Sequence, residues 1–194
     1  MRWPAQRWRS VLFTDESRFC LSVGDGRVRA WRRKGERYAS CCIRQHDRWG
    51  SGSVMVWGGI HHHGKTQLVF IQGNLTARRY VDEVLCPAAV PCIWQHNLTL
   101  QHDNARPHAA RLTQDFLQAQ GVDVLPWPAY SPDLSPIEHL WDHLDRSVRS
   151  HDPPPQTLPA LRQALQEEWD NFLQAKIQRL MSSMRRRCIA VSEA

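Results

Sequence analysis

Three acidic side chains occupy positions from which carboxylates can act together. Asp15 closes a short apolar run that begins at Val11, and Asp103 closes a second run that begins at Leu98. Glu138 lies at the start of an amphipathic pattern. Carboxylates without Cys or His at ligand spacing suit a hard cation, Mg²⁺ or Mn²⁺. A pair of such ions activates a water or a 3′-hydroxyl and stabilises the leaving oxygen of an in-line phosphoryl displacement.

Each acid also has a purely structural interpretation, and spacing alone leaves the two open. Asp15 could form a turn at a strand end. Asp103 and Asn104 could form an Asx turn before a helix. Glu138 is the fourth residue of a capping box that begins at Ser135.

The elements that must position these acids follow from hydrophobic periodicity and turn residues. Helices are expected from Thr76, which is a candidate N-cap, to a break at Cys86-Pro87, and again from Pro107 to Gly121 and from Pro136 onward. A continuous or bent helical region follows the Pro153–Pro155 linker. Strands are expected over 11–15, 19–23, 53–57, 67–71, 98–103 and 122–125. This order predicts an α/β fold with a mixed sheet covered by helices on both faces. Such sheets place active sites at the carboxyl ends of strands, where Asp15 and Asp103 stand.

Composition narrows the class of protein. The 194 residues correspond to about one domain, and 42% hydrophobic with 23% charged residues is typical of a globular protein. No apolar run approaches the roughly 20 residues of a membrane span, and we expect no secretory signal at the start. The net charge of +6 favours a polyanionic partner such as nucleic acid. The six cysteines include no Cys-x-x-Cys pair, so we expect reduced thiols and no zinc ribbon or finger.

Four sequence blocks, in this order, resemble the catalytic domain of the Tc1/mariner-type DDE transposases, Tc1 branch. The spacing of 34 residues between Asp103 and Glu138 matches that branch. The resemblance runs from about Trp8 to Cys188. The blocks are VLFTDESRF (11–19), SVMVWGGI (53–60), LQHDNARPH (100–108) and WPAYSPDLSPIEHLWD (127–142).

The resemblance implies an RNase H-like fold in which Asp15, Asp103 and Glu138 are the catalytic residues and hold two Mg²⁺ ions, with Mn²⁺ as a substitute. Family members cut DNA at transposon ends and join the 3′-hydroxyl into TA target dinucleotides. They act as dimers in the nucleus. The resemblance therefore implies DNA transposition and integration by metal-dependent strand cleavage and strand transfer, with DNA as the partner.

The expected organisation is a catalytic domain over residues 1–150 and a helical extension over 151–194 packed on it. The family's N-terminal helix-turn-helix domains, which read the transposon ends, are expected to be absent. The alternative function is therefore a truncated, inactive or domesticated remnant that binds DNA without transposing.

Several polar residues outside the three acids could contact DNA. The basic stretch from Arg27 to Arg37, with candidate contacts at Arg32, Arg33 and Lys34, is either a DNA- and partner-contacting loop or a solvated hairpin. Arg106 is a further candidate. His108 could contact DNA, orient Asp103 or simply be a polar residue at a helix start. His61-His62-His63 is expected to be a hairpin turn, with a soft-metal site as the alternative.

Overall fold

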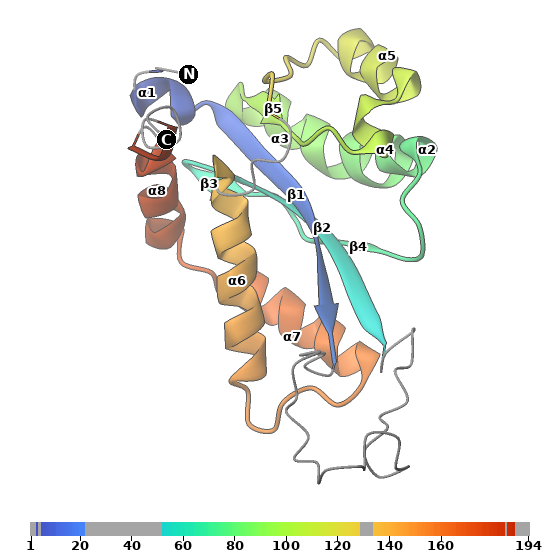
Figure 1. Ribbon diagram of the computed structural model, residues 1–194, viewed down its shortest axis with the longest axis vertical. Helices are drawn as coiled ribbons and strands as arrows, with labels where there is room; N and C mark the ends of the chain where they lie inside the picture. The colour runs from blue at the N-terminus through green and yellow to red at the C-terminus, as the bar shows by residue number, and fades with distance from the viewer. Residues whose placement is uncertain (1–2, 4, 22–51, 129–133, 185, 189–194) are drawn as a thin grey trace, which may run out of the picture.

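The computed structural model describes residues 3, 5–21, 52–128, 134–184 and 186–188. The basic stretch over 27–37, including Arg32, Arg33 and Lys34, lies outside the described residues. A mixed sheet runs through the molecule and separates two groups of helices (Figure 1). Among the helices described, none combines the length and apolar character that crossing a bilayer requires.

The sheet is built on two long antiparallel strands. β1 (Val11–Cys20) pairs with β2 (Ser53–His61), and β5 (Thr99–Gln101) joins the other edge of β1 in parallel. β3 (Gly64–Lys65) and β4 (Val69–Ile71) both pair with β2 in antiparallel fashion. The predicted mixed sheet is thus confirmed. The expected strand over 122–125 is reduced to a single parallel bridge between Val124 and Leu100.

β1 is one strand where two were expected. The polar residues between the two expected strands stay in register with β2, with Asp15 opposite Gly58 and Arg18 opposite Met55. Strand pairing uses backbone groups, so polar side chains interrupt the apolar pattern without interrupting the ladder. Asp15 therefore lies in the middle of a ten-residue strand.

Two hydrophobic cores lie on the two faces of the sheet. Alternate residues of β1 divide between them: Val11 and Phe13 pack in one core and Leu12 in the other. The α6 core takes residues from α1 (Ala5–Trp8), α6 (Pro136–Arg149), α7 (Leu158–Asp170) and α8 (Gln174–Ser182). The α3 core takes residues from η1 (Tyr80–Ala89), α3 (Val90–His96) and α5 (Arg111–Ala119). Helices therefore cover both faces, as expected.

The helix expected from Thr76 is confirmed at its start and wrong at its end. The Thr76 side chain accepts a hydrogen bond from the Arg79 N–H and caps α2 (Ala77–Arg79). The chain then continues through the π-helical stretch η1, which contains Pro87, into α3. A proline ring clashes with the carbonyl four residues earlier in an α-helix, and the wider i→i+5 turn of a π-helix relieves that clash.

The helical region after residue 157 consists of two helices, α7 and α8, whose apolar residues lie in the same core as β1. Trp169 of α7 stacks on Trp141 of α6, with ring centroids 5.4 Å apart, and its indole N–H donates to the Thr66 carbonyl. A Cβ on Gly58 would lie 2.6 Å from the Trp169 ring, so only glycine fits beneath the two tryptophans. The core thus crosses residue 150, and the proposed domain boundary there stays a prediction.

Candidate active site

Asp15 points to the face of the sheet that α6 covers. Residues directly opposite each other in an antiparallel pair share a face, and Asp15 lies opposite Gly58, whose missing side chain faces Trp141 and Trp169. The next residue, Glu16, points to the opposite face, because side chains alternate along a strand. The carboxyl group of Asp15 is only partly exposed.

Asp103 lies two residues after β5, the parallel neighbour of β1. The β1–β5 register pairs Phe13 with Gln101, so its continuation by two residues leads to Asp15 and Asp103. One carboxylate oxygen of Asp103 accepts a hydrogen bond from the Ala105 N–H at 2.9 Å. The Asx turn considered from the sequence is therefore present, and it leaves Asp103 exposed beside Asp15.

Glu138 lies in the first turn of α6, after Pro136, which suits that position. Ser135 precedes the helix, but its side chain makes no capping bond, and its buried hydroxyl has no partner among the described residues. The alternative assignment of Glu138 to a capping box is thus not borne out. Its carboxylate is instead close enough to Asp15 to raise that group's pKa.

The three predicted acids form one electrostatic cluster. Burial raises the pKa of Asp15 to about 8, with further contributions from the negative charges of Glu138, Glu16 and Asp103. Repelling carboxylates that are partly withdrawn from water favour a proton or a cation between them. The charges of Glu138 and Asp103 thus act on Asp15, while a divalent cation held jointly by Asp15, Asp103 and Glu138 stays a prediction.

His108 supports this cluster from the other face of the sheet. It lies in α4 (Arg106–Ala109), and its buried ring places Nδ1 2.6 Å from an Asp103 carboxylate oxygen and Nε2 3.2 Å from Glu16. Burial alone would lower the pKa of His108, but the hydrogen bonds and charges of Asp103 and Glu16 outweigh it and raise that pKa to about 9. In turn the hydrogen bond from His108 lowers the pKa of Asp103. His108 is therefore a cation that donates to two carboxylates.

A second layer of buried rings holds His108 in place. His102 stacks on it with a centroid distance of 4.9 Å and an interplanar angle of 9°, and Tyr80 lies against it at 4.3 Å. The pKa of His102 is lowered to about 4 by burial and by the charge of His108, so His102 is neutral. The Tyr80 hydroxyl lies 3.2 Å from His102 Nδ1. Two adjacent histidines thus hold different protonation states.

Arg106 and His108 are the predicted DNA contacts that lie within the described residues. Arg106 is exposed at the start of α4, on the same loop as Asp103, and its contact with DNA stays a prediction. His108 has both ring nitrogens facing carboxylates, so the geometry favours the orienting role over a phosphate contact. Sequence reasoning missed Glu16, the second partner of His108. Its signal was its position beside Asp15, because adjacent strand residues serve opposite faces.

Comparison with known proteins places this chain in a family. Residues 10–162 match the DDE superfamily endonucleases. Two Caenorhabditis elegans proteins are similar in sequence. The transposable element Tc1 transposase is 33% identical over all of this chain and 71% of its own length, and the transposable element Tc3 transposase is 30% identical over 95% of this chain and 56% of its own length. This chain thus spans only part of the curated relatives that it matches.

Among solved structures, the Mos1 transposase catalytic domain with Raltegravir and Mn has a similar fold, with a TM-score of 0.70 at 18% identity. The match covers 96% of this chain and 84% of that one. It supports the RNase H-like fold expected from the sequence. The family match and the Tc1 and Tc3 similarities agree with the four sequence blocks. The chain belongs to the DDE superfamily endonucleases and corresponds to the catalytic domain of a Tc1/mariner-type DDE transposase.

Proposed function

We propose that this domain catalyses metal-dependent cleavage and transfer of DNA strands in transposition. The observation that carries the proposal is the raised pKa of Asp15, which arises from burial together with the charges of Glu138, Glu16 and Asp103. All four acids lie in the family's sequence blocks, and Asp15, Asp103 and Glu138 come from separate parts of the fold: β1, the loop after β5, and α6. A purely structural acid does not require such a cluster.

We assign the metal ligands to Asp15, Asp103 and Glu138, and we propose that they hold two Mg²⁺ ions, which Mn²⁺ can replace. Such ions, when bound, activate the attacking oxygen and stabilise the leaving one. The Mos1 transposase catalytic domain has been solved with Raltegravir and Mn and with Raltegravir and Mg, which supports divalent cations in this fold. Neutralising the cluster removes the repulsion that otherwise protonates Asp15.

The chain's own residues prepare the site before any cation arrives. His108 holds Asp103 through a charged hydrogen bond, and the Ala105 N–H fixes the same carboxylate oxygen. Both donors contact the same Asp103 oxygen, and among the described residues no hydrogen bond is made to its other oxygen, which could therefore bind a metal. A pocket of about 480 Å³ opens beside Asp103, with Asn104, Gln114 and Trp127 in its lining, and offers room for substrate next to that one acid.

The substrate is proposed to be DNA, namely transposon ends and a TA target, bound by a homodimer in the nucleus. A Mos1 structure of the same fold is described as a paired-end complex with the left transposon end, which supports both DNA and pairing of subunits. The positive net charge supports a polyanionic partner. Arg106 and the basic residues Arg32, Arg33 and Lys34 are proposed to contact it.

The test is nicking of supercoiled DNA in Mg²⁺ or Mn²⁺ by the wild type and by Asp103→Asn. Asn keeps an oxygen for the Ala105 N–H but removes the charge, so nicking should fall by at least about 100-fold. Asp115→Asn, an exposed acid paired with Arg111 on α5, is the matched control and should nick normally. Equal rates in Asp103→Asn would refute the assignment. A wild type that nicks with neither ion would favour the DNA-binding remnant.

A further inference from the structure

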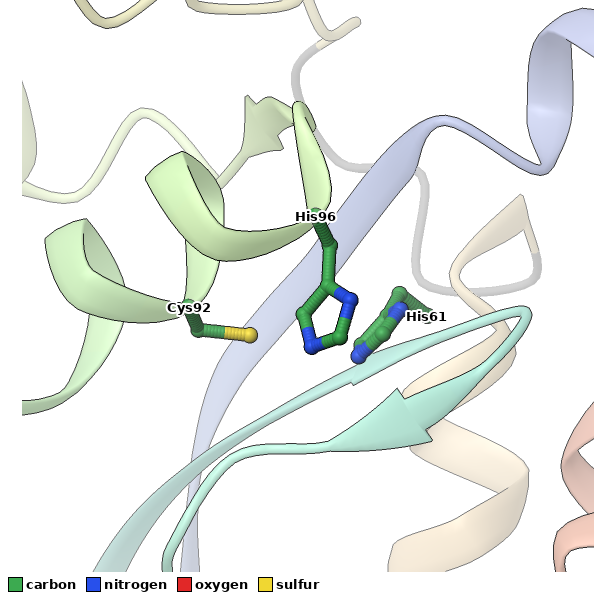
Figure 2. A group of neighbouring side chains, drawn as sticks. All are labelled: His61, Cys92 and His96. Atoms are coloured by element: carbon green, nitrogen blue, oxygen red, sulfur yellow. The ribbon is translucent and has the colours of Figure 1, made fainter.

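A second cluster of ligand-type side chains lies away from the acids, on the α3 side of the sheet. His61 ends β2, while Cys92 and His96 lie on α3. One ligand atom from each residue falls within 4.8 Å of the others. Figure 2 shows the two imidazole rings and the thiol facing a common point between β2 and α3.

Local structure accounts for this convergence. Cys92 and His96 are four residues apart in a helix, so they share one face. The hairpin from β2 to β3 turns at His62 and His63, as expected from the sequence, and places His61 opposite Gly64. A Cβ on Gly64 would lie 3.0 Å from His61 Nε2, so glycine leaves room for the ring. The rings of His61 and His96 lie with their centroids 4.6 Å apart.

His61 is the residue whose burial needs an explanation. Its side chain is 1% exposed, and its Nδ1 has no hydrogen-bond partner among the described residues. An unpaired buried polar atom is unfavourable unless another group satisfies it. Burial and the neighbouring histidines also lower the pKa of His61 to about 4, which leaves the ring neutral with a lone pair available.

We propose that His61, Cys92 and His96 form a second metal site, which binds Zn²⁺ and ties the end of β2 to α3. Two imidazoles and one thiolate are a ligand set for zinc and a poor one for Mg²⁺. Tetrahedral zinc with bonds of about 2.0–2.3 Å separates its ligands by roughly 3.3–3.6 Å, so the side chains need to close only slightly. Water can complete the coordination. The site is separate from the carboxylates and does not depend on the proposed DNA chemistry.

Cobalt offers the sharpest test, because a thiolate ligand gives Co²⁺ a charge-transfer band that oxygen ligands do not. The full chain, stripped of metal and kept reduced, is titrated with Co²⁺ in excess Mg²⁺, which occupies the carboxylates. We expect one equivalent to give the thiolate band and the strong d–d bands of a tetrahedral site. Zn²⁺ should displace it stoichiometrically.

Two variants and a matched control assign the ligands. Cys92→Ser should abolish the charge-transfer band, and His96→Gln should weaken Co²⁺ and Zn²⁺ binding by at least about tenfold. Cys92 is half-buried and His96 exposed, so both changes should preserve the fold. Cys86→Ser, an exposed cysteine of η1 outside the cluster, should bind as the wild type does.

A measurement on the wild-type chain tests the site without relying on variants that could misfold. In excess Mg²⁺, Zn²⁺ should protect Cys92 from alkylation while Cys86 stays reactive, as read by peptide mass spectrometry. Absence of the thiolate band, equal affinity in Cys92→Ser, or alkylation of Cys92 unaffected by Zn²⁺ would each overturn the proposal.

Discussion

Asp15 and Glu16 are neighbours in β1 and carry the same functional group, yet they meet opposite surroundings. Asp15 faces the α6 side, where Glu138 raises its pKa further. Glu16 faces the other side and receives a hydrogen bond from the cationic His108. Neighbouring residues of one strand therefore do different tasks. Asp15, whose charge no cationic side chain balances among the described residues, attracts a metal cation. Glu16, whose charge is balanced by His108, holds the residue that orients Asp103.

The largest expected effect comes from a substitution among the acids on the α6 side of the sheet. Glu138→Gln should lower metal-dependent nicking by at least about 100-fold, because a neutral amide is a poor ligand for Mg²⁺. Its melting temperature without metal should not fall, since the capping box is not formed and a repelling charge is lost. Glu83→Gln, a surface acid paired with Arg79, is the control. Wild-type nicking by Glu138→Gln would remove Glu138 from the site.

Substitutions of His108 or Glu16, on the other side of the sheet, should have a smaller effect on the nicking rate. His108→Gln and Glu16→Gln leave all three proposed ligands in place but loosen Asp103, so metal affinity should fall about 10–100-fold. The Mn²⁺ dependence of the nicking rate measures this, and high Mn²⁺ should restore most of the rate. A loss that no metal concentration rescues would mean that these residues act on the reaction itself.

Substitutions at Gly58 and Gly59 test the packing of the two faces. Gly58→Ala would put a methyl group 2.6 Å from Trp169, a rigid ring in a stacked pair, and should cost about 1–3 kcal/mol of unfolding free energy. Gly59→Ala meets Leu12 at 3.0 Å on the other face, where a flexible side chain can move, and should cost less. Denaturant unfolding of both variants shows which one loses more unfolding free energy. A larger loss for Gly59→Ala would contradict it.

The last expected effect concerns the pH dependence of stability without metal. Asp15 titrates near 3.8 when unfolded and at about 8 in the fold. Between these two values the folded state holds a proton on Asp15 that the unfolded state releases, so the contribution of Asp15 to stability falls as pH rises from 4 to 8. In EDTA, Asp15→Asn should remove this loss and be more stable than the wild type near pH 7.

Substitutions of Asp15 and of Glu16 should shift the melting temperature in opposite directions in that experiment. Glu16→Gln removes a partner of the His108 cation and should lower the melting temperature in EDTA, whereas Asp15→Asn raises it. Melting curves of both variants between pH 4 and 8 decide the matter. If the two variants shift the melting temperature in the same direction, Asp15 and Glu16 do not have opposite roles.

The sequence allowed the acids to be predicted because each leaves a local signal. Asp15 and Asp103 end apolar runs, and Glu138 opens a strongly amphipathic helix after Pro136. The mixed sheet followed from the order of strands and helices. The family resemblance added the expectation that the three acids meet, which spacing alone could not supply.

Other features could not be predicted from the sequence because they depend on which distant segments the fold brings together. The hydrogen bond between Glu16 and His108 joins residues 92 positions apart in the sequence. The position of Glu16 beside Asp15 indicates which face of the strand it is on, but not its partner. Cys92 and His96 do carry a helical spacing, but the expected break at Pro87 concealed the helix that presents them. The turn at His61–His63 was expected, whereas its contact with α3 requires the packed structure.

The core of α6, α7 and α8 has a consequence for synthesis of the protein. β1 leaves the ribosome early, but one of its faces is covered by Trp141, Trp169 and Met181, which are made much later. At about 5–20 residues per second, that delay is on the order of ten seconds. During this interval the nascent strand exposes Val11 and Phe13 to its surroundings. We therefore expect ribosome-bound chains that end before α7 to bind chaperones and to be sensitive to protease, and release of α7 and α8 to end both.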